Sequence, residues 1–502
     1  MGSATAKEGS PIVRALAAVA FLLALVAGAS ASAGRGDTAA PGRVLVTGVA
    51  EDAVRALTLA DAKAQMALLQ PAGLRAVRVT SIWEPGTTAP SDIELTILRN
   101  IETAARLQGI RVFVSVFPSG SRTTPLTPEA QQELALYAAA VVRSIPSFDD
   151  VIVGNEPNLN RFWMPQFAAD GSDAAAVSYE ATLAAAYDAV KAVDPSIRVW
   201  GGALAPRGVD RPNTGRDTHS PTAFIRDLGA AYRASGRTLP LMDGLAFHPY
   251  ADTSSQSPDF AHPNTTTIGL ADYGKLTALL GEAFDGTAQT GATLPILYDE
   301  FGVETVIPLS KAGLYSGTEP ATTKPVDETT QAGYYTRALQ LAFCQPTVTG
   351  LLLFHAVDET TLATWQSGIY YADGTQKSSF APVATSLALT NGGSIARCDG
   401  LGLVVQPLTL RFPTRAESAR GNRRVRFRCD RDCAYDVRLT RFPSGATTLV
   451  KRGKAPARTP VIADLESRKL VPARYRYSVS LRHPVNPAPT PTIRASAVFS
   501  LP

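Results

Sequence analysis

The sequence holds few of the residues and motifs that mark nucleotide- or metal-dependent proteins. Only four of its 502 residues are cysteine and five are histidine. It contains no Walker sequence, and no Gly-x-Gly-x-x-Gly turn follows the first strand that we predict, so nucleotide-binding α/β folds are disfavoured. Histidine, aspartate and glutamate are not clustered at the spacing of metal ligands. We therefore expect no metal and no cofactor.

Glycine, proline and net charge are also too low for several classes of chain. The 39 glycines and 36 prolines are too few for a collagenous or low-complexity protein. With 45% apolar residues and a formal net charge of only +4, general disorder is disfavoured as well. A chain of this length can bury a large core, and a single α/β barrel can use about 250 residues or more.

Long apolar runs are missing after the first 33 residues, and the run inside them is short. Lys7 and Arg14 precede an uncharged segment, 15–33, that is closed by small residues. Its apolar centre of about 11 residues is shorter than the roughly 20 of a membrane-spanning helix. We predict that residues 1–33 are a signal peptide cleaved near Ala33, and that the mature protein is secreted or extracellular without a membrane span. An uncleaved membrane anchor is the alternative.

The four cysteines of an exported chain are typical of two disulfides. Cys429 and Cys433 flank a short polar loop between strand-like runs, so we predict a bond between them. This pairing leaves Cys344 to bond with Cys398, although the two other connectivities stay open. A zinc site is disfavoured because the nearest histidines lie far from Cys429 and Cys433 in the sequence.

From about residue 43 onward, short β-branched runs alternate with stretches of helical period. The runs are nearly continuous in apolar residues, as in strands buried on both faces. We predict strands at Val44–Val49, Ala76–Ile82, Ile110–Phe117, Val151–Gly154, Ile197–Leu204, Gly244–His248, Pro295–Phe301 and Leu351–His355. Helices are predicted between them, for example at Asp92–Leu107, Thr127–Ser144, Ala174–Val193 and Glu328–Phe343. The pattern is typical of an α/β fold, a (β/α)₈ TIM barrel, with a doubly wound open sheet as the rival.

After Cys398 the helical period is lost and short alternating runs follow. Separated by turn residues, these runs are typical of a small all-β sandwich domain. We predict strands at Leu403–Val405, Leu408–Phe412, Val425–Phe427, Tyr435–Leu439, Thr448–Lys451, Val461–Leu465, Tyr475–Leu481 and Ala497–Phe499. The predicted organisation is a signal peptide over 1–33, a barrel over 34–395 and a β-sandwich accessory domain over 396–502.

The near-neutral total charge hides a division between these two domains. Residues 411–502 hold 20 basic and 6 acidic residues, whereas residues 1–410 hold 28 basic and 38 acidic ones. A basic module favours contact with an anionic cell wall or polysaccharide, and a solvated arginine-rich surface is the alternative. The module has no recognised nucleic-acid-binding motif, so no nucleic-acid partner is expected. We expect the protein to be a monomer.

Two glutamates follow strands at the barrel end where functional side chains gather. Glu156 follows the fourth strand and Glu300 lies at the end of the seventh. Paired carboxyl groups are what cleavage of a glycosidic bond requires, one to donate a proton and one to attack or to stabilise the positive centre. Glu84 and Glu304 are rivals for either role. Asp299 is expected to face away from Glu300, because strand residues alternate.

Other residues near the strand ends could position these carboxyl groups or a sugar. Arg78 and Tyr250 are candidates to hold Glu300 ionised and oriented, and His248 lies on the same side of an extended chain as Tyr250. Asn155 could hydrogen-bond a sugar hydroxyl. Arg78 could instead pair with a carboxylate on a neighbouring strand, and His248 could be a core histidine. Of the aromatic residues, Trp163 and Trp365 are the best placed to stack on sugar rings, since both lie in loops after strand ends.

These motifs together resemble the glycoside hydrolases of clan A, the barrel enzymes with catalytic glutamates on strands four and seven, and families 5 and 39 in particular. The resemblance covers roughly residues 43–390. It rests on Arg78, Asn155-Glu156-Pro157, His248-Pro249-Tyr250 and Glu300 within Tyr-Asp-Glu-Phe-Gly.

The resemblance implies a retaining glycosidase that cleaves β-glycosidic bonds of a carbohydrate, with Glu156 as acid/base and Glu300 as nucleophile. One departure concerns the end of strand eight, where many members have a tryptophan and this chain has Phe354-His355. Trp365 in the following loop is the candidate to replace it. A non-catalytic carbohydrate-binding or cell-surface protein on a decayed barrel is the alternative function.

Overall fold

The computed structural model describes residues 45–392, 409–411, 423–429, 433–456, 459–482 and 493–501. The predicted signal peptide over 1–33 and the predicted domain boundary at 395 and 396 lie outside these ranges. No helix within the described ranges is long and apolar enough to cross a membrane.

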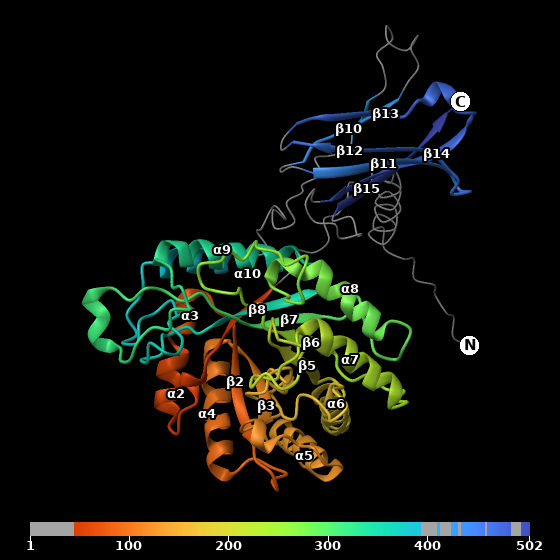
Figure 1. Cartoon of the computed structure of the whole chain (residues 1–502). Coiled ribbons are helices and arrows are strands. Elements are labelled where there is room, and N and C mark those ends of the chain that lie inside the picture. Colours follow the sequence, from red (N-terminus) through yellow and green to blue (C-terminus); the bar gives the residue numbers. More distant parts are fainter. Residues whose placement is uncertain are drawn as a thin grey trace, which may run out of the picture. The chain divides into compact units, whose positions relative to one another are not determined.

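Eight parallel strands close into a barrel in chain order, with the last strand paired to the first (Figure 1). The strands are β1 (Val46–Ala50), β2 (Ala76–Trp83), β3 (Arg111–Pro118), β4 (Asp150–Val153), β5 (Arg198–Leu204), β6 (Gly244–Phe247), β7 (Ile296–Phe301) and β8 (Val348–Phe354). The predicted TIM barrel is therefore confirmed. Each of its strands overlaps a predicted one, because apolar runs of this length are buried on both faces.

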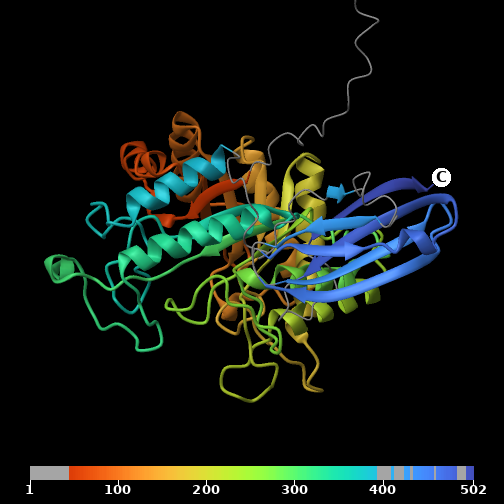
Figure 2. The ribbon, with the colours of Figure 1, turned by 90° about the horizontal axis from the view of Figure 1, so that it is seen from above.

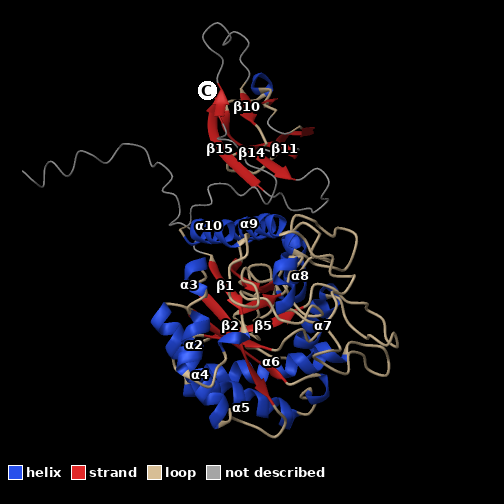
Figure 3. Ribbon diagram, turned by 90° about the vertical axis from the view of Figure 1, so that its left-hand side faces the viewer, coloured by secondary structure: helices blue, strands red, loops and turns tan. Residues whose placement is uncertain are grey.

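Helices cover the outside of the barrel (Figure 3). They are α2 (Leu59–Met66), α3 (Leu69–Ala72), α4 (Asp92–Gln108), α5 (Pro128–Ser144), α6 (Ala174–Val193), α7 (Pro221–Ala234), α8 (Tyr273–Phe284), α9 (Glu328–Cys344) and α10 (Phe380–Asn391). Thr127 and Ser220 cap α5 and α7, each before a first-turn proline. The last two helices, α9 and α10, lie side by side (Figure 2). Short 3₁₀ segments lie at Asp52–Val54, Ser121–Thr123, Leu270–Asp272, Leu309–Leu314 and Ser467–Lys469.

The inside of the barrel is packed with side chains. Trp200 and Phe113 meet edge to face, with ring centroids 6.3 Å apart. A Cβ atom at Gly244 would lie 2.3 Å from the Trp200 ring, so this ring needs a glycine on the adjacent strand. The interior is therefore a solid core that supports the strand ends above it.

The C-terminal β domain contains two antiparallel sheets, in the orders β13-β10-β9 and β12-β11-β14-β15. Buried residues from both sheets form one apolar cluster, as in a sandwich. The strands are β9 (Thr409–Arg411), β10 (Arg424–Phe427), β11 (Cys433–Arg441), β12 (Thr447–Ala455), β13 (Val461–Asp464), β14 (Ala473–Arg482) and β15 (Ile493–Leu501). Each overlaps a predicted run, and the remaining run, Leu403–Val405, lies outside the described residues.

One predicted disulfide is confirmed. Cys429 and Cys433 are bonded, with their Cα atoms 6.2 Å apart. The bond joins the second residue after β10 to the first residue of β11, and so connects the two sheets. Cys398 lies outside the described residues, so its bond with Cys344 stays a prediction.

Candidate active site

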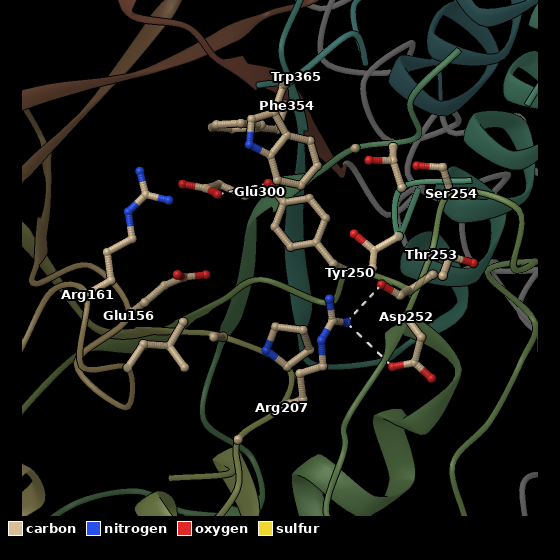
Figure 4. A pocket seen from close by; sticks show the side chains of 18 of the residues that line it. Glu156, Arg161, Arg207, Tyr250, Asp252, Thr253, Ser254, Glu300, Phe354 and Trp365 are labelled. Carbon is tan, nitrogen blue, oxygen red and sulfur yellow. Dashed lines mark hydrogen bonds and ion pairs between the residues drawn. The ribbon is translucent and has the colours of Figure 1, made fainter. Parts of the chain in front are cut away.

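A cavity of about 710 Å³ lies at the C-terminal ends of the barrel strands (Figure 4). This is the end at which barrel proteins place functional groups. Five of the predicted site residues line it, namely Asn155, Glu156, Tyr250, Glu300 and Trp365. Arg78 and His248 are buried behind these residues and contact them, as described next.

Glu156 reaches the cavity through a sharp turn at the end of β4. Its φ angle is 42°, and Gly154 before it has φ 92°. The backbone N–H of Glu156 donates to the carbonyl of Ala203 at 2.8 Å, which ties the turn to β5. Left-handed backbone is costly for a residue other than glycine, and such strain concentrates at functional sites. The turn thus brings Glu156 to the cavity at the C-terminal end of the barrel.

Glu300 reaches the cavity because β7 contains an irregularity. Its pairing with β8 advances three residues, from Tyr298 to Phe301, while β8 advances only two. Such a bulge interrupts the alternation of side chains. Consequently Asp299 contacts the same Arg78 as Glu300 does. Our prediction that Asp299 faces away from Glu300 is therefore wrong. The prediction failed because alternation holds only in a regular strand.

Arg78 of β2 connects the C-terminal ends of β4 and β7 beneath the cavity. Its Nη1 donates to Glu300 Oε1, and its Nη2 donates to Asn155 Oδ1 at 2.7 Å. Its Nε lies 3.3 Å from Asp299 Oδ2. On the opposite carboxylate oxygen, Glu300 accepts a hydrogen bond of 2.9 Å from the Tyr250 hydroxyl. Burial and the Glu300 carboxylate raise the pKa of Tyr250, so the hydroxyl remains a donor.

His248 lies between the two glutamates. Its Nδ1 is 3.0 Å from Glu156 Oε1 and 3.5 Å from Glu300 Oε2, and its Nε2 is 3.4 Å from Asp299 Oδ2. Burial alone would lower the pKa of His248, but the carboxylates of Glu300 and Asp299 outweigh it and raise this pKa to about 10. His248 is therefore a buried cation at neutral pH.

Aromatic side chains form one wall of the cavity. The rings of Trp365 and Tyr250 lie 5.0 Å apart at 31°, and Phe354 meets Trp365 edge to face at 5.2 Å. Trp365 is half-buried and lines the cavity. A flat aromatic surface of this kind suits the apolar face of a sugar ring.

The structure contradicts the prediction that Trp163 stacks on a sugar. The side chain is 1% exposed, donates to Ser178 Oγ at 2.9 Å and packs edge to face on Tyr179. The loop after β4 folds back on α6 and buries this indole in the core. Its neighbour Phe162 lines the cavity instead.

The two rival glutamates differ in position. Glu84 is exposed, accepts from Ser119 and does not line the cavity. Glu304 lines it, and burial together with the nearby carboxylate of Glu319 raises the pKa of Glu304 to about 8. Glu304 is therefore mostly uncharged at neutral pH.

Sequence reasoning missed three arginines of the cavity wall. Arg161 follows β4, and Arg207 and Arg216 follow β5. The available signal was their position in loops after strand ends, the same signal that identified the glutamates.

Within the described residues, one group has the ligand types and spacing of a metal site. Atoms of Asp173, His219 and Asp227 lie within 4.8 Å of one another. Burial raises the pKa of Asp173 to about 7, and His219 Nε2 is 2.9 Å from the carbonyl of Gln166. The fold brings this group together from distant positions, which sequence spacing did not reveal. None of the three residues lines the cavity.

No family model and no curated protein matches the sequence. Among solved structures, the chain is similar to a glucosidase from Croceicoccus marinus at 12% identity and a TM-score of 0.47, covering 86% of this chain and 94% of that one. It is also similar to the endo-beta-1,4-mannanase from Thermotoga petrophila, at 10% identity and a TM-score of 0.44, covering 91% and 97% of the two chains. A third similar structure is an exo-beta-1,4-mannosidase from Opitutaceae bacterium strain TAV5, at 17% identity and a TM-score of 0.45, covering 73% of this chain and 63% of that one. The function of this chain therefore rests on its own residues.

Proposed function

We propose that the protein is a secreted retaining glycoside hydrolase that cleaves β-glycosidic bonds. One observation carries this proposal: two glutamates from different strand ends contact the same imidazole nitrogen and face one cavity. Two carboxyl groups placed across a cavity are the apparatus of glycosidic cleavage. The aromatic wall formed by Trp365 and Tyr250 supplies a surface for the sugar.

The two carboxyl groups are close enough for a retaining reaction. Because Glu156 Oε1 and Glu300 Oε2 lie 3.0 and 3.5 Å from His248 Nδ1, these oxygens are at most about 6.5 Å apart. Retaining enzymes separate their carboxyl groups by about 5–5.5 Å, and inverting enzymes by about 6.5–9.5 Å to admit a water molecule.

The charges around the glutamates support their separate roles. Asp299, Glu300 and Glu156 surround two cations, Arg78 and His248, so one carboxyl proton makes the group neutral. Although burial opposes it, the pKa of Asp299 is held below its ordinary value by His248 and Arg78. Glu300 accepts hydrogen bonds from Arg78 and Tyr250, which hold it in position as the nucleophile. Glu156, which lines the cavity after the end of β4, is the group that we assign as acid/base.

The reaction follows from these roles. The Glu300 carboxylate attacks the anomeric carbon, the glycosidic C–O bond breaks, and the proton of Glu156 moves to the leaving oxygen. The Glu156 carboxylate then takes a proton from water, whose oxygen attacks the anomeric carbon and releases Glu300. Arg78 and Tyr250 orient Glu300 throughout, and Asn155, held by Arg78, is placed to hydrogen-bond a sugar hydroxyl.

The test measures hydrolysis of 4-nitrophenyl β-glycosides and polysaccharides by the mature chain. We expect Glu156→Ala to lower turnover about 10²- to 10⁴-fold, the usual contribution of acid–base catalysis. Glu300→Ala should lower it by at least as much, since the covalent intermediate is lost. Glu84→Gln is the control, because this exposed glutamate also follows a barrel strand, β2, but does not line the cavity.

Azide distinguishes the two roles. In the Glu300→Ala variant, azide should replace the nucleophile and give the α-glycosyl azide, whereas in Glu156→Ala it should give the β-glycosyl azide. Wild-type turnover in either variant would contradict the assignment. Binding of oligosaccharides without any product, in the wild-type chain, would establish the decayed barrel as a carbohydrate-binding protein instead.

Secretion is the part of this proposal that concerns residues 1–33. The basic start, the short apolar centre and the small residues before Ala33 support it. The chain recovered from the culture medium should begin directly after Ala33 when its N-terminus is sequenced. A full-length N-terminus in the membrane fraction would establish an anchor.

We also propose that the β domain binds an anionic polysaccharide through one face of its larger sheet. Cross-strand pairs place exposed basic residues on the face opposite the core, because the alternate residues Tyr475 and Tyr477 are buried. The basic residues of this face are Arg438, Arg452, Lys454, Arg474 and Arg476. Closely spaced cations on a flat surface suit a chain of regularly spaced anions.

The full chain should bind polygalacturonate more tightly than neutral dextran, with an affinity that falls as salt is added. Arg438→Ser combined with Arg476→Ser should weaken this binding about tenfold, whereas Arg99→Ser, an exposed arginine of α4, should not. Equal binding by both variants would contradict the proposal and show that this basic face is an ordinary solvated surface.

A further inference from the structure

The cavity wall carries three arginines in addition to the two glutamates. Arg161 comes from the loop after β4, and Arg207 and Arg216 come from the loop after β5. Figure 4 shows Arg161 and Arg207 reaching the cavity that Glu156 faces. Three guanidinium groups on the wall of one concave site are unusual unless something anionic enters it.

Two of these arginines, Arg161 and Arg216, lie at the same end of a β-bridge that joins the two loops. Leu159 and Thr218 form an isolated antiparallel bridge between the two loops. Arg161 lies two residues after Leu159 and Arg216 two residues before Thr218. In an antiparallel pair, the residue two positions after one partner and the residue two positions before the other lie at the same end of the bridge. The two loops are fixed further, since Asn158 Nδ2 donates to the His219 carbonyl at 2.9 Å.

These arginines differ from Arg78 in how their charge is balanced. Arg78 is buried and paired with Glu300 and Asp299. Within the described part of the chain, Arg161 and Arg216 have no carboxylate within ion-pair distance, and Arg207 has only Asp252 at 3.5 Å, with both side chains about half exposed. The wall thus presents two guanidinium groups, those of Arg161 and Arg216, that have no carboxylate within ion-pair distance among the described residues, and a third, that of Arg207, beside Asp252.

The other acidic group of the wall does not offset them. Glu304 is mostly uncharged at neutral pH, as described above, because burial and Glu319 raise its pKa to about 8. The catalytic carboxyl groups have their own cations in Arg78 and His248. An anion that entered the cavity would therefore meet unpaired guanidinium groups with little opposing charge.

We infer that Arg161, Arg207 and Arg216 form a subsite for an anionic sugar, whose carboxylate or sulfate lies beside the scissile bond. The inference rests on the proposed glycosidase function and specifies its substrate class. Guanidinium groups suit both anions, because their planar donors bind two oxygens at once. The glycan would then be a polymer or oligomer that contains uronic acid or sulfated residues.

Binding tests this subsite without requiring hydrolysis. Calorimetry compares methyl β-glycosides of uronic acids, of sulfated sugars and of the corresponding neutral sugars, on the Glu300→Gln variant of the mature chain. We expect an acidic glycoside to bind at least about tenfold more tightly than its neutral counterpart, an advantage that shrinks as salt is added. The carboxylated and sulfated series distinguish the two sources of charge. Equal or tighter binding of the neutral sugars would overturn the inference.

Variants then identify the residues. Arg161→Gln and Arg216→Gln should each lower the ratio of acidic to neutral affinity about tenfold. Arg211→Gln is the matched control, because this arginine lies in the same loop and is exposed but does not line the cavity. An unchanged ratio in both test variants, or an equal loss in the control, would contradict the subsite.

The two proposals fail in different ways. If neutral aryl glycosides are cleaved in a reaction that needs Glu300 while acidic ones are poorer substrates, the subsite is wrong and the glycosidase stands. If acidic glycosides bind through Arg161 and Arg216 but nothing is cleaved, the subsite stands and the glycosidase is wrong.

Discussion

The two ends of the barrel both hold a buried carboxylate among basic residues, yet only one of these groups reaches the cavity. At the N-terminal ends of the strands, Asp150 accepts from Arg111 at 2.7 Å and from the indole of Trp200 at 2.9 Å, and Arg198 lies 3.1 Å away. Each oxygen of this carboxylate has a partner. The group joins β3, β4 and β5, and none of its residues lines the cavity at the other end.

At the C-terminal ends, the corresponding group contains Arg78, His248, Asp299, Glu156 and Glu300. Asp299, Arg78 and His248 are buried and do not line the cavity, whereas Glu156 and Glu300 contact this group and also line the cavity. One end of the barrel therefore uses its charged residues to join strands, and the other also uses them to hold two carboxyl groups at a cavity.

The largest effect that distinguishes the ends is expected from Arg78→Gln. It removes one of the two cations that Glu300 and Asp299 share and leaves His248 as the other, so we expect kcat/KM to fall about 10²- to 10³-fold. Thermal unfolding should show that the variant is folded but less stable, since an unpaired buried charge costs about 3–5 kcal/mol. Arg78→Lys restores the charge but not the two guanidinium nitrogens that bond Glu300 and Asn155, and it should recover part of the activity.

At the other end, Asp150→Asn should affect stability alone. The loss of a charged acceptor for Arg111 and Trp200 should lower the free energy of unfolding by about 2 kcal/mol, measured with urea. Because the group is remote from the cavity, kcat/KM should stay within about twofold of the wild type. A large loss of activity in this variant would remove the distinction between the two ends.

The charge of His248 predicts a dependence of stability on pH. Its pKa is raised from 6.5 to about 10 in the folded chain, so the folded state holds a proton that the unfolded state loses. This contribution is complete below about pH 6.5 and declines as the pH rises to about 10, by at most about 1.4 kcal/mol per unit. Urea unfolding across this range should show the decline in the wild type. In His248→Gln the decline should be smaller, and an identical decline would contradict the assignment.

The smallest effect is expected from the aromatic wall. Trp365→Ala should raise KM about tenfold with little change in kcat, because the lost stacking, about 1–1.5 kcal/mol, acts on the bound substrate as well as on the transition state. Trp163→Phe is the matched control, since the buried indole is replaced by a smaller ring outside the cavity. An equal change of KM in both variants would show that Trp365 acts through folding.

Much of the fold could be predicted because its signals are local. The apolar runs of β3 and the cap at Thr127 depend on neighbouring residues, and both are as expected. Glu156 and Glu300 were identified by their position at strand ends, which follows from the order of strands and helices. Asp299 could not be placed, because the bulge in β7 depends on how that strand pairs with β8.

Side chains in the loops were the hardest to predict. Trp163 and Phe162 are adjacent, and which of them faces the cavity depends on how the loop packs against α6. Arg161 and Arg216 lie in different loops, and the bridge between Leu159 and Thr218 brings them together. These relations join residues that are far apart in the chain or depend on packing, so no local pattern expresses them.

The sequence thus specifies an eight-stranded α/β barrel, a basic β module and two glutamates at strand ends, since periodicity, composition and chain order are local properties. The contacts among Arg78, His248, Asp299 and Glu300 required the folded chain. The same holds for the bulge that turns Asp299 inward and for the arginine wall. These features share one physical reason. Closing the barrel brings strand ends from distant parts of the chain close together, where nearby charges and burial together determine the pKa of each side chain.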